Sequence, residues 1–192
     1  VKQLYETFIP GTASWNDSSN NKAFLAGELY CTANGISIYV TAEKENKAIA
    51  EDMNHAYLPI GPVGKPTELH LAFPILTFQF TKYPQACKAF AAFMQEAPQF
   101  NPWIEAAQGY LSPFLKAYDA NPIWTSDPKV TPYRDVAKRT LTPAGLGKLG
   151  EKAAAVIADF VVVDMFANYC TGREDLKGAI AGAERQAKRI YR

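Results

Sequence analysis

Residues 153–167 read AAAVIADFVVVDMFA, and the rest of the chain is expected to pack around this apolar run. Apolar residues occur almost all the way round a helical wheel, which is typical of a helix buried on most of its faces. Val161–Val163 alone would favour a strand, but the length of the run favours a helix. A bilayer span needs about 20 apolar residues, and Asp159 and Asp164 interrupt this run, so no membrane span is expected.

A second helix is expected directly after the first. Gly172 suits the end of the apolar helix, and Glu174 and Asp175 follow where acidic side chains favour a new helix N-terminus. Apolar side chains then recur at spacings of three and four, which predicts an amphipathic helix that covers the buried one. These side chains are Leu176, Ile180, Ala183, Ala187 and Ile190.

The composition is that of an ordinary globular protein. Of the 192 residues, 48% are apolar and 20% are charged, which suits one core or one lobe of a larger protein. The formal net charge of +1 excludes a bulk field that would attract nucleic acid or an anionic membrane. Residues 1–6 lack the basic start and apolar core of a signal peptide. A start at Val1 suggests a mature product or an excised part.

The cysteines and histidines do not form a metal-ligand pattern. His55 and His70 have no Cys, Asp or Glu at ligand spacing, so a structural role is favoured for both. The odd number of cysteines and their wide separation argue against a disulfide framework and favour buried, inert thiols at Cys31, Cys87 and Cys170. We therefore expect no cofactor and no metal site.

Catalytic motifs are not recognisable either. Gly145–Gly150 resembles a phosphate loop, but it follows no strand and lacks the Lys-Ser/Thr ending. Asp159 and Asp164 lie about 140° apart round a helix, so they would not converge on one substrate as glycoside hydrolysis requires. The sequence therefore predicts a protein that is not an enzyme and has no catalytic residues.

Aromatic side chains in polar loops are the remaining candidates for binding. A ring offers an apolar face and its Asn or Ser neighbours offer hydrogen bonds, a combination that suits a sugar. Core packing is the more frequent role of such rings and stays open for each of them. The four rings are Trp15, Tyr39, Tyr110 and Trp124.

Short helices and a small sheet are expected before the apolar run. Pro84 suits the first turn of a helix that carries Phe90 and Phe93 on one face. Asn34-Gly35 indicates a turn, followed by an element of uncertain type at 36–41. Apolar and β-branched runs predict strands at residues 29–33, 55–60 and 69–80.

Five short motifs follow one another along the chain. They are Phe-x-x-Gly with a later Asn-Gly and aromatics (21–28 and 33–39), Leu-Pro-x-Gly-Pro-x-Gly (58–64), a helix start with Lys and Pro (81–90), Gly-Tyr-Leu-Ser-Pro (109–113) and Thr-Gly-Arg-Glu-Asp-Leu (171–176). In this order they resemble the bacterial extracellular solute-binding proteins of ABC sugar importers, the family that includes the maltose-binding protein. The inserted Ser112 departs from the family pattern.

The resemblance implies an α+β, helix-rich fold: the C-terminal lobe region of a type II periplasmic-binding-protein fold, with helices packed on a small sheet. It covers the C-terminal half of such a protein. Residues 1–192 are therefore expected to be a fragment with a missing N-terminal lobe. Within it, residues 1–80 would be the strand-containing part and residues 81–192 the mainly helical part.

The resemblance also implies a function. Family members bind a solute in a cleft between two lobes that close by a hinge motion, and they deliver it to the permease of an ABC transporter. For this chain it implies periplasmic binding of a sugar or sugar-like solute without chemistry. The alternative is a helical protein-interaction module without a small-molecule ligand. An enzyme that uses Asp159 or Asp164 ranks third.

The candidate ligand-binding residues come from the same resemblance. It places three of them on the strand-end loop that contains Asn34-Gly35 and faces the cleft, and two on a loop that is usually glycine-rich. One more lies on the Gly-Tyr loop and one before the long helix. Arg134 and Arg139 could reach solute hydroxyls or a phosphate, although solvated surface is favoured for both. Together with Trp124, the expected ligand-binding residues are Asn34, Ser37, Tyr39, Ala72, Phe73, Tyr110, Trp124 and Gly147.

Overall fold

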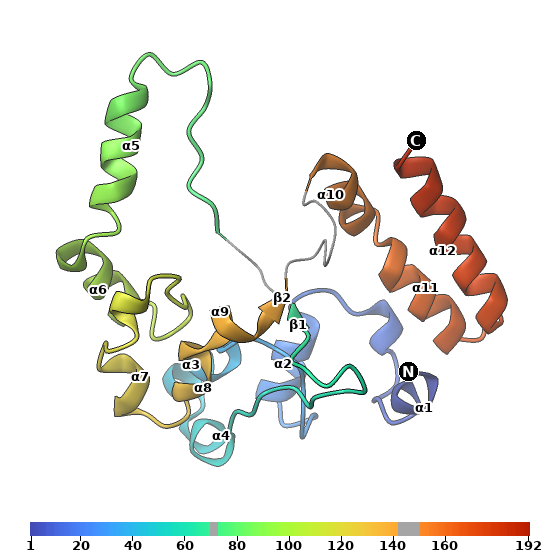
Figure 1. The fold of residues 1–192 in the computed structure, drawn as a ribbon. Coiled ribbons are helices and arrows are strands. Elements are labelled where there is room, and N and C mark those ends of the chain that lie inside the picture. The colour runs from blue at the N-terminus through green and yellow to red at the C-terminus, as the bar shows by residue number, and fades with distance from the viewer. Residues whose placement is uncertain (70–72, 142–149) are drawn as a thin grey trace. The chain divides into compact units, whose positions relative to one another are not determined.

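The computed structural model describes residues 1–69, 73–141 and 150–192 (Figure 1). The chain forms two compact units, one made of Val1–Tyr30 with Thr142–Arg192 and the other of Cys31–Leu141. It passes from one unit to the other twice, after Tyr30 and after Leu141. The units cut across the predicted parts 1–80 and 81–192, because the first unit joins the N-terminal residues to the C-terminal helices.

The first unit is helical in its described residues. α11 packs against α10 and α12, and α1 also contacts α11. The Nζ atom of Lys2 lies 5.3 Å from the ring centroid of Tyr169, which adds a cation–π contact between α1 and α11. The helices are α1 (Lys2–Tyr5), η1 (Thr12–Ser14), α2 (Ser19–Leu25), α10 (Glu151–Ala158), α11 (Val161–Cys170) and α12 (Leu176–Ile190).

α12 has the boundaries that the periodicity predicts. Asp175 caps its N-terminus, since its Oδ1 accepts the backbone N–H of Gly178 at 2.7 Å. Ala179 is buried, and most of the half-buried positions of α12 are Gly or Ala, although Gln186 and Ile190 are also half-buried. Small side chains let two helix axes approach closely, and α12 packs against α11.

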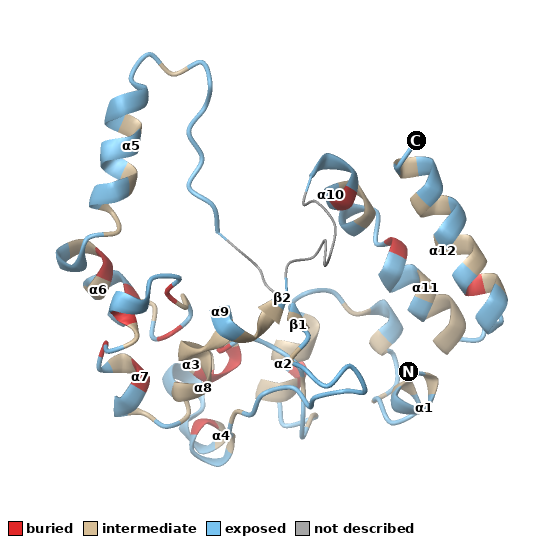
Figure 2. Ribbon diagram, viewed as in Figure 1, coloured by how far each residue is buried: buried red, intermediate tan, exposed pale blue. Residues whose placement is uncertain are grey.

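The apolar run 153–167 differs from its prediction. It forms two helices instead of one, because Phe160 adopts a left-handed conformation (φ 53°) between α10 and α11. Nor is it buried on most faces: Val163 is 59% and Phe166 is 41% exposed (Figure 2). A left-handed non-glycine residue costs about 1–2 kcal/mol, so tertiary packing and not local preference sets this break.

Glu151–Cys170 is also the stretch that resembles a membrane-crossing helix. By length (20 residues) and mean hydropathy (1.6) alone, it is long and apolar enough to cross a bilayer. The break at Phe160 divides it into helices of eight and ten residues. Each is shorter than the roughly 20 residues that a continuous span requires.

The second unit contains the remaining helices and both strands. Its core includes buried side chains of α3, α6, η2 and α7, among them Ile104 and Trp124, together with Ile36 directly before α3. The elements are α3 (Ser37–Glu45), α4 (Lys47–Asp52), β1 (Glu68–Leu69), α5 (Pro84–Phe93), α6 (Ala97–Ala106), η2 (Lys116–Tyr118), α7 (Ile123–Ser126), α8 (Thr131–Arg134), α9 (Val136–Arg139) and β2 (Thr140–Leu141).

The sheet is smaller than predicted. β1 and β2 pair in parallel, with Glu68 opposite Thr140 and Leu69 opposite Leu141. The predicted strands at 29–33 and 55–60 are not formed, and residues 73–80 are extended or turn without pairing. A strand needs a neighbour for its backbone groups, and the apolar pattern does not say whether one is present. The helix-rich fold with a small sheet is nevertheless confirmed.

Two further predictions concern single elements. The helix that begins at Pro84 is confirmed as α5, with proline in its first turn. The predicted burial of the cysteines is wrong for Cys31, which is exposed, while Cys87 and Cys170 are partly buried. Cys31 lies where the chain enters the second unit.

Candidate functional site

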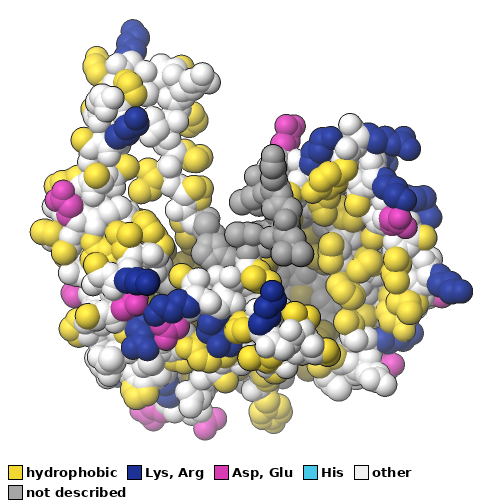
Figure 3. All heavy atoms as spheres, viewed as in Figure 1, with side chains coloured by type: hydrophobic (Ala, Val, Ile, Leu, Met, Phe, Trp, Pro, Cys, Tyr) yellow, Lys and Arg dark blue, Asp and Glu magenta, His cyan; other side chains and the backbone are white. Residues whose placement is uncertain are grey.

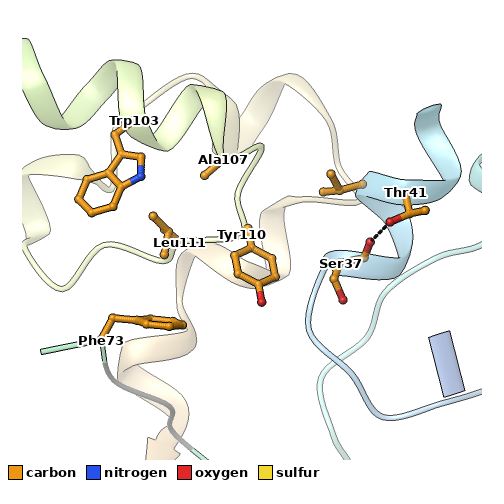
Figure 4. A pocket seen from close by; sticks show the side chains of 8 residues that line it. Ser37, Thr41, Phe73, Trp103, Ala107, Tyr110 and Leu111 are labelled. Carbon is orange, nitrogen blue, oxygen red and sulfur yellow. Dashed lines mark hydrogen bonds between the residues drawn. The ribbon is translucent and has the colours of Figure 1, made fainter. Parts of the chain in front are cut away.

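The second unit has a pocket of about 570 Å³ between α3, the end of α6 and the chain around Phe73 (Figure 4). Two hydroxyl side chains lie on the α3 side, and three aromatic rings lie on the other segments. The pocket is lined by Ser37, Val40, Thr41, Phe73, Trp103, Ala107, Tyr110 and Leu111.

The α3 wall follows from helical spacing. Ser37, Val40 and Thr41 stand at positions i, i+3 and i+4, so they share one face of the helix. The hydroxyl of Thr41 donates to the carbonyl of Ser37 at 3.0 Å. That bond uses the donor of Thr41 and leaves its oxygen able to accept a hydrogen bond from a ligand.

The facing wall begins on α6. Trp103 is 45% exposed, and its ring meets that of the buried Phe100 edge-to-face at 5.7 Å. Gln108 (φ 51°) and Gly109 (φ 80°) then end the helix with two left-handed residues. This turn brings Tyr110, which is 55% exposed, to the pocket.

Both walls are held from behind by residues 124–133. A Cβ atom placed on Gly109 would lie 2.7 Å from Cγ1 of Val130, so the Gly109 backbone packs directly on this segment. The hydroxyl of Ser112 donates to the carbonyl of Tyr133 at 2.7 Å. The segment therefore fixes the loop that presents Tyr110.

Tyr39 ties the same segment to α3. Its ring is buried, and its hydroxyl donates to Oδ2 of Asp127. The other oxygen of Asp127 accepts the backbone N–H of Lys129 at 2.9 Å. Burial first, and then the bond and negative charge of Asp127, raise the pKa of Tyr39 well above its usual value.

Lys129 and His55 add further hydrogen bonds to this connection between Tyr39 and residues 124–133. The ammonium group of Lys129 donates to the carbonyls of Ala50 and Glu51 at 2.5 and 2.7 Å, which satisfies the C-terminal end of α4. Nδ1 of His55 lies 2.7 Å from the carbonyl of Lys129, so Nδ1 carries the proton of this bond. The structural role predicted for His55 agrees with this contact.

The structure brings together three of the predicted ligand-binding residues. Ser37, Phe73 and Tyr110 all line the pocket. Asn34 is exposed outside it, and its Oδ1 accepts the N–H of Gly35 at 2.7 Å. Ala72 and Gly147, like His70, lie outside the described residues.

Tyr39 and Trp124 lie in the core and not on an open surface. Trp124 has no exposed area, and its indole N–H donates to the carbonyl of Tyr118 at 2.9 Å. The packing alternative that the sequence left open therefore describes both rings. They support the pocket from behind through α3 and Gly109.

Sequence reasoning missed most of the α6 wall. Trp103 and Ala107 are four residues apart on one helical face. Pro98 and Pro102, however, predict only short, interrupted helices in this part of the chain. Both prolines are tolerated within α6. The useful signal was the i, i+4 spacing of Trp103 and Ala107 next to the Gly-Tyr turn.

Arg134 and Arg139 are engaged elsewhere. Arg134 pairs with Asp135 at 3.0 Å, which raises the pKa of the guanidinium. Arg139 pairs with Glu68 at 3.2 Å and lies over the ring of Tyr57, 3.8 Å from its centroid. Arg139 thus braces the β1–β2 pair, because Glu68 belongs to β1 and Arg139 directly precedes β2.

The stability of the second unit is expected to fall at alkaline pH because of Tyr133, whose ring meets that of His55 edge-to-face at 5.1 Å. Burial raises the pKa of Tyr133 to about 12, so the folded state holds the phenol proton more tightly than the unfolded chain. The stabilisation is complete below about pH 10 and is lost as the pH rises through 12. We expect urea midpoints to fall over this window and to fall less in Tyr133→Phe. The fully exposed Tyr30, changed to Phe, is the matched control. An equal alkaline loss in all three proteins would contradict the assignment.

The described parts of the chain contain no cluster of three or more His, Cys, Asp or Glu side chains that could hold a metal ion. What the pocket offers is exposed rings beside hydroxyl groups. Such a surface can hold a small neutral solute with apolar faces and polar edges.

The sequence matches a known protein family. The family model described as "Bacterial extracellular solute-binding protein" matches residues 1–132, which include every residue that lines the pocket. A search of the curated proteins finds no match.

Proposed function

Because this chain belongs to the bacterial extracellular solute-binding proteins, we propose that it is the substrate-binding component of an ABC transporter for a sugar or sugar-like solute. The family establishes solute binding and an exported setting, and its members are in general not enzymes. The sugar, the periplasmic location and delivery to a membrane permease belong to the proposal.

The pocket is the observation that carries the sugar assignment. Trp103 and Tyr110 expose about half of their side chains, at 45% and 55%, and Phe73 exposes 74%. Rings exposed in this way can stack on the C–H faces of a sugar ring. Ser37 and Thr41 lie on the other wall, where they would face the hydroxyl groups at the edge of the sugar ring.

We also propose that this pocket supplies only one wall of the complete site. Micromolar affinity corresponds to about 8 kcal/mol, and rings this exposed leave one side of a solute in water. A second lobe that closes by a hinge motion would cover that side. The 192 residues alone are therefore expected to bind sugar weakly. Calorimetry that gives a micromolar Kd for this chain would overturn the one-wall proposal.

The test of the pocket is saturation-transfer NMR with mono-, di- and oligosaccharides at millimolar concentration. We expect transfer to at least one sugar, reduced about tenfold or more in Trp103→Ala and in Tyr110→Ala, because each change removes a stacking face. Tyr30→Ala removes an exposed ring outside the pocket and is expected to have no effect. Transfer that survives both pocket changes would remove the site from consideration.

The alternative function, a helical protein-interaction module, rests on a different observation. The chain from 75 to 93 exposes large apolar side chains at Ile75, Leu76, Phe78, Phe80, Tyr83, Phe90 and Phe93. Exposed apolar surface of this kind is typical of a protein contact. Sugar transfer that depends on Trp103 favours solute binding. A stable dimer without sugar transfer favours the alternative.

A further inference from the structure

α12 divides its solvent-exposed surface into two flanks. One flank is apolar, with Leu176, Ile180 and Tyr191 each 50–55% exposed. The other flank is basic and spans about 120° of the helical wheel. It is formed by five exposed side chains, Lys177, Arg185, Lys188, Arg189 and Arg192, which we call the basic flank.

The charge of the basic flank is a local excess. Residues 176–192 carry five basic side chains and one acidic side chain, a net charge of +4 in a chain whose total is +1. All other residues together therefore carry −3. Lys and Arg side chains gather over the part of the surface where α12 lies (Figure 3). A charge separation of this kind orients a protein toward an anionic surface.

Neighbouring carboxylates neutralise only part of this excess. Glu184 pairs with Lys188 at 2.7 Å, and the bond lowers the pKa of Glu184. The carboxylate of Asp175 is used as the helix N-cap. Basic residues in the last turn also favour the helix dipole, which gives Lys188 and Arg189 a structural role. That role does not extend to Arg185, which lies a turn earlier, or to Lys177 in the first turn.

The helix is held firmly enough to present both flanks. The helix packs on α11, and its less exposed positions are mostly Gly and Ala. Lys152 of α10 donates to the carbonyl of Tyr191 at 2.8 Å, which ties down the C-terminal end. The two flanks are therefore fixed side by side on one exposed surface.

We propose that this surface of α12 binds the anionic headgroups of a phospholipid bilayer. Basic side chains beside exposed apolar ones are the pattern of helices that lie in the membrane interface. Guanidinium and ammonium groups pair with lipid phosphates, and the apolar flank meets the boundary of the acyl chains. The proposal does not use the solute pocket, whose residues belong to the other unit.

The test is cosedimentation of the 192-residue chain with vesicles of phosphatidylglycerol and phosphatidylcholine. We expect binding to mixed vesicles and at least tenfold weaker binding to pure phosphatidylcholine. High salt is expected to abolish the difference, because it screens exposed charges. Arg185→Glu/Arg189→Glu/Arg192→Glu is expected to weaken binding to the mixed vesicles at least tenfold.

The matched control changes the same net charge elsewhere. Lys65→Glu/Lys88→Glu/Lys116→Glu reverses three exposed lysines of the second unit and is expected to keep at least half of the binding. Equal loss in both variants, equal binding to neutral vesicles or salt-insensitive binding would overturn the proposal. The proposal would also be overturned if the chain bound an acidic protein through this surface but did not bind vesicles. Sugar transfer measured on the same variants separates this outcome from the solute-binding proposal.

Discussion

Trp124→Ala is expected to lower the free energy of unfolding of the Cys31–Leu141 unit by about 3–5 kcal/mol. The side chain has no exposed area, so its removal leaves a cavity in the core. The change also leaves the carbonyl of Tyr118 without its indole donor. Urea denaturation followed by circular dichroism measures the loss, and hydrogen exchange locates it within residues 31–141.

Trp103→Ala is the control for that prediction. Trp103 is 45% exposed and lines the pocket, so its removal is expected to cost about 1 kcal/mol or less while reducing sugar transfer. Trp124→Ala is thus expected to change mainly the stability, and Trp103→Ala mainly the sugar transfer. If both variants unfold at the same urea midpoint, Trp124 is not the core residue that its burial indicates.

Gly109→Ala is expected to cost about 2–5 kcal/mol, the sum of two effects. A left-handed alanine costs about 1–2 kcal/mol, and Gly109 has a φ of 80°. The added Cβ would also lie 2.7 Å from Val130, and overpacking of this kind costs about 1–3 kcal/mol. Urea midpoints measure the stability. Sugar transfer is expected to fall as well, because the loop that carries Tyr110 must shift.

Gly64→Ala isolates the backbone part of this cost. Gly64 has a φ of 75°, and a Cβ there would meet nothing within 4 Å. Only the left-handed penalty, about 1–2 kcal/mol, is expected. Adding Val130→Ala to Gly109→Ala should recover part of the larger loss, and a double-mutant cycle measures this coupling. Equal costs for Gly64→Ala and Gly109→Ala would contradict the contact with Val130.

The candidate site was predictable only in part. Ser37, Phe73 and Tyr110 were named from their place in family-like motifs, and they share the pocket. Trp103 was overlooked because Pro98 and Pro102 predict only short, interrupted helices there, whereas the structure places both prolines within the single helix α6. The sequence identified suitable rings, but it could not say which of them face solvent.

By itself the sequence determined the features that depend on neighbours along the chain: the boundaries of α12, the proline-started α5 and the ordered motifs of the family. Capping, periodicity and turn chemistry act over a few residues, so they can be read directly. Only the tertiary structure decided that the run 153–167 breaks at Phe160, that residues 73–80 lack a strand partner, and that Tyr39 and Trp124 are buried while Tyr110 is exposed. These outcomes depend on which distant segments pack together, and an apolar or aromatic residue is equally suited to a core and to a binding wall.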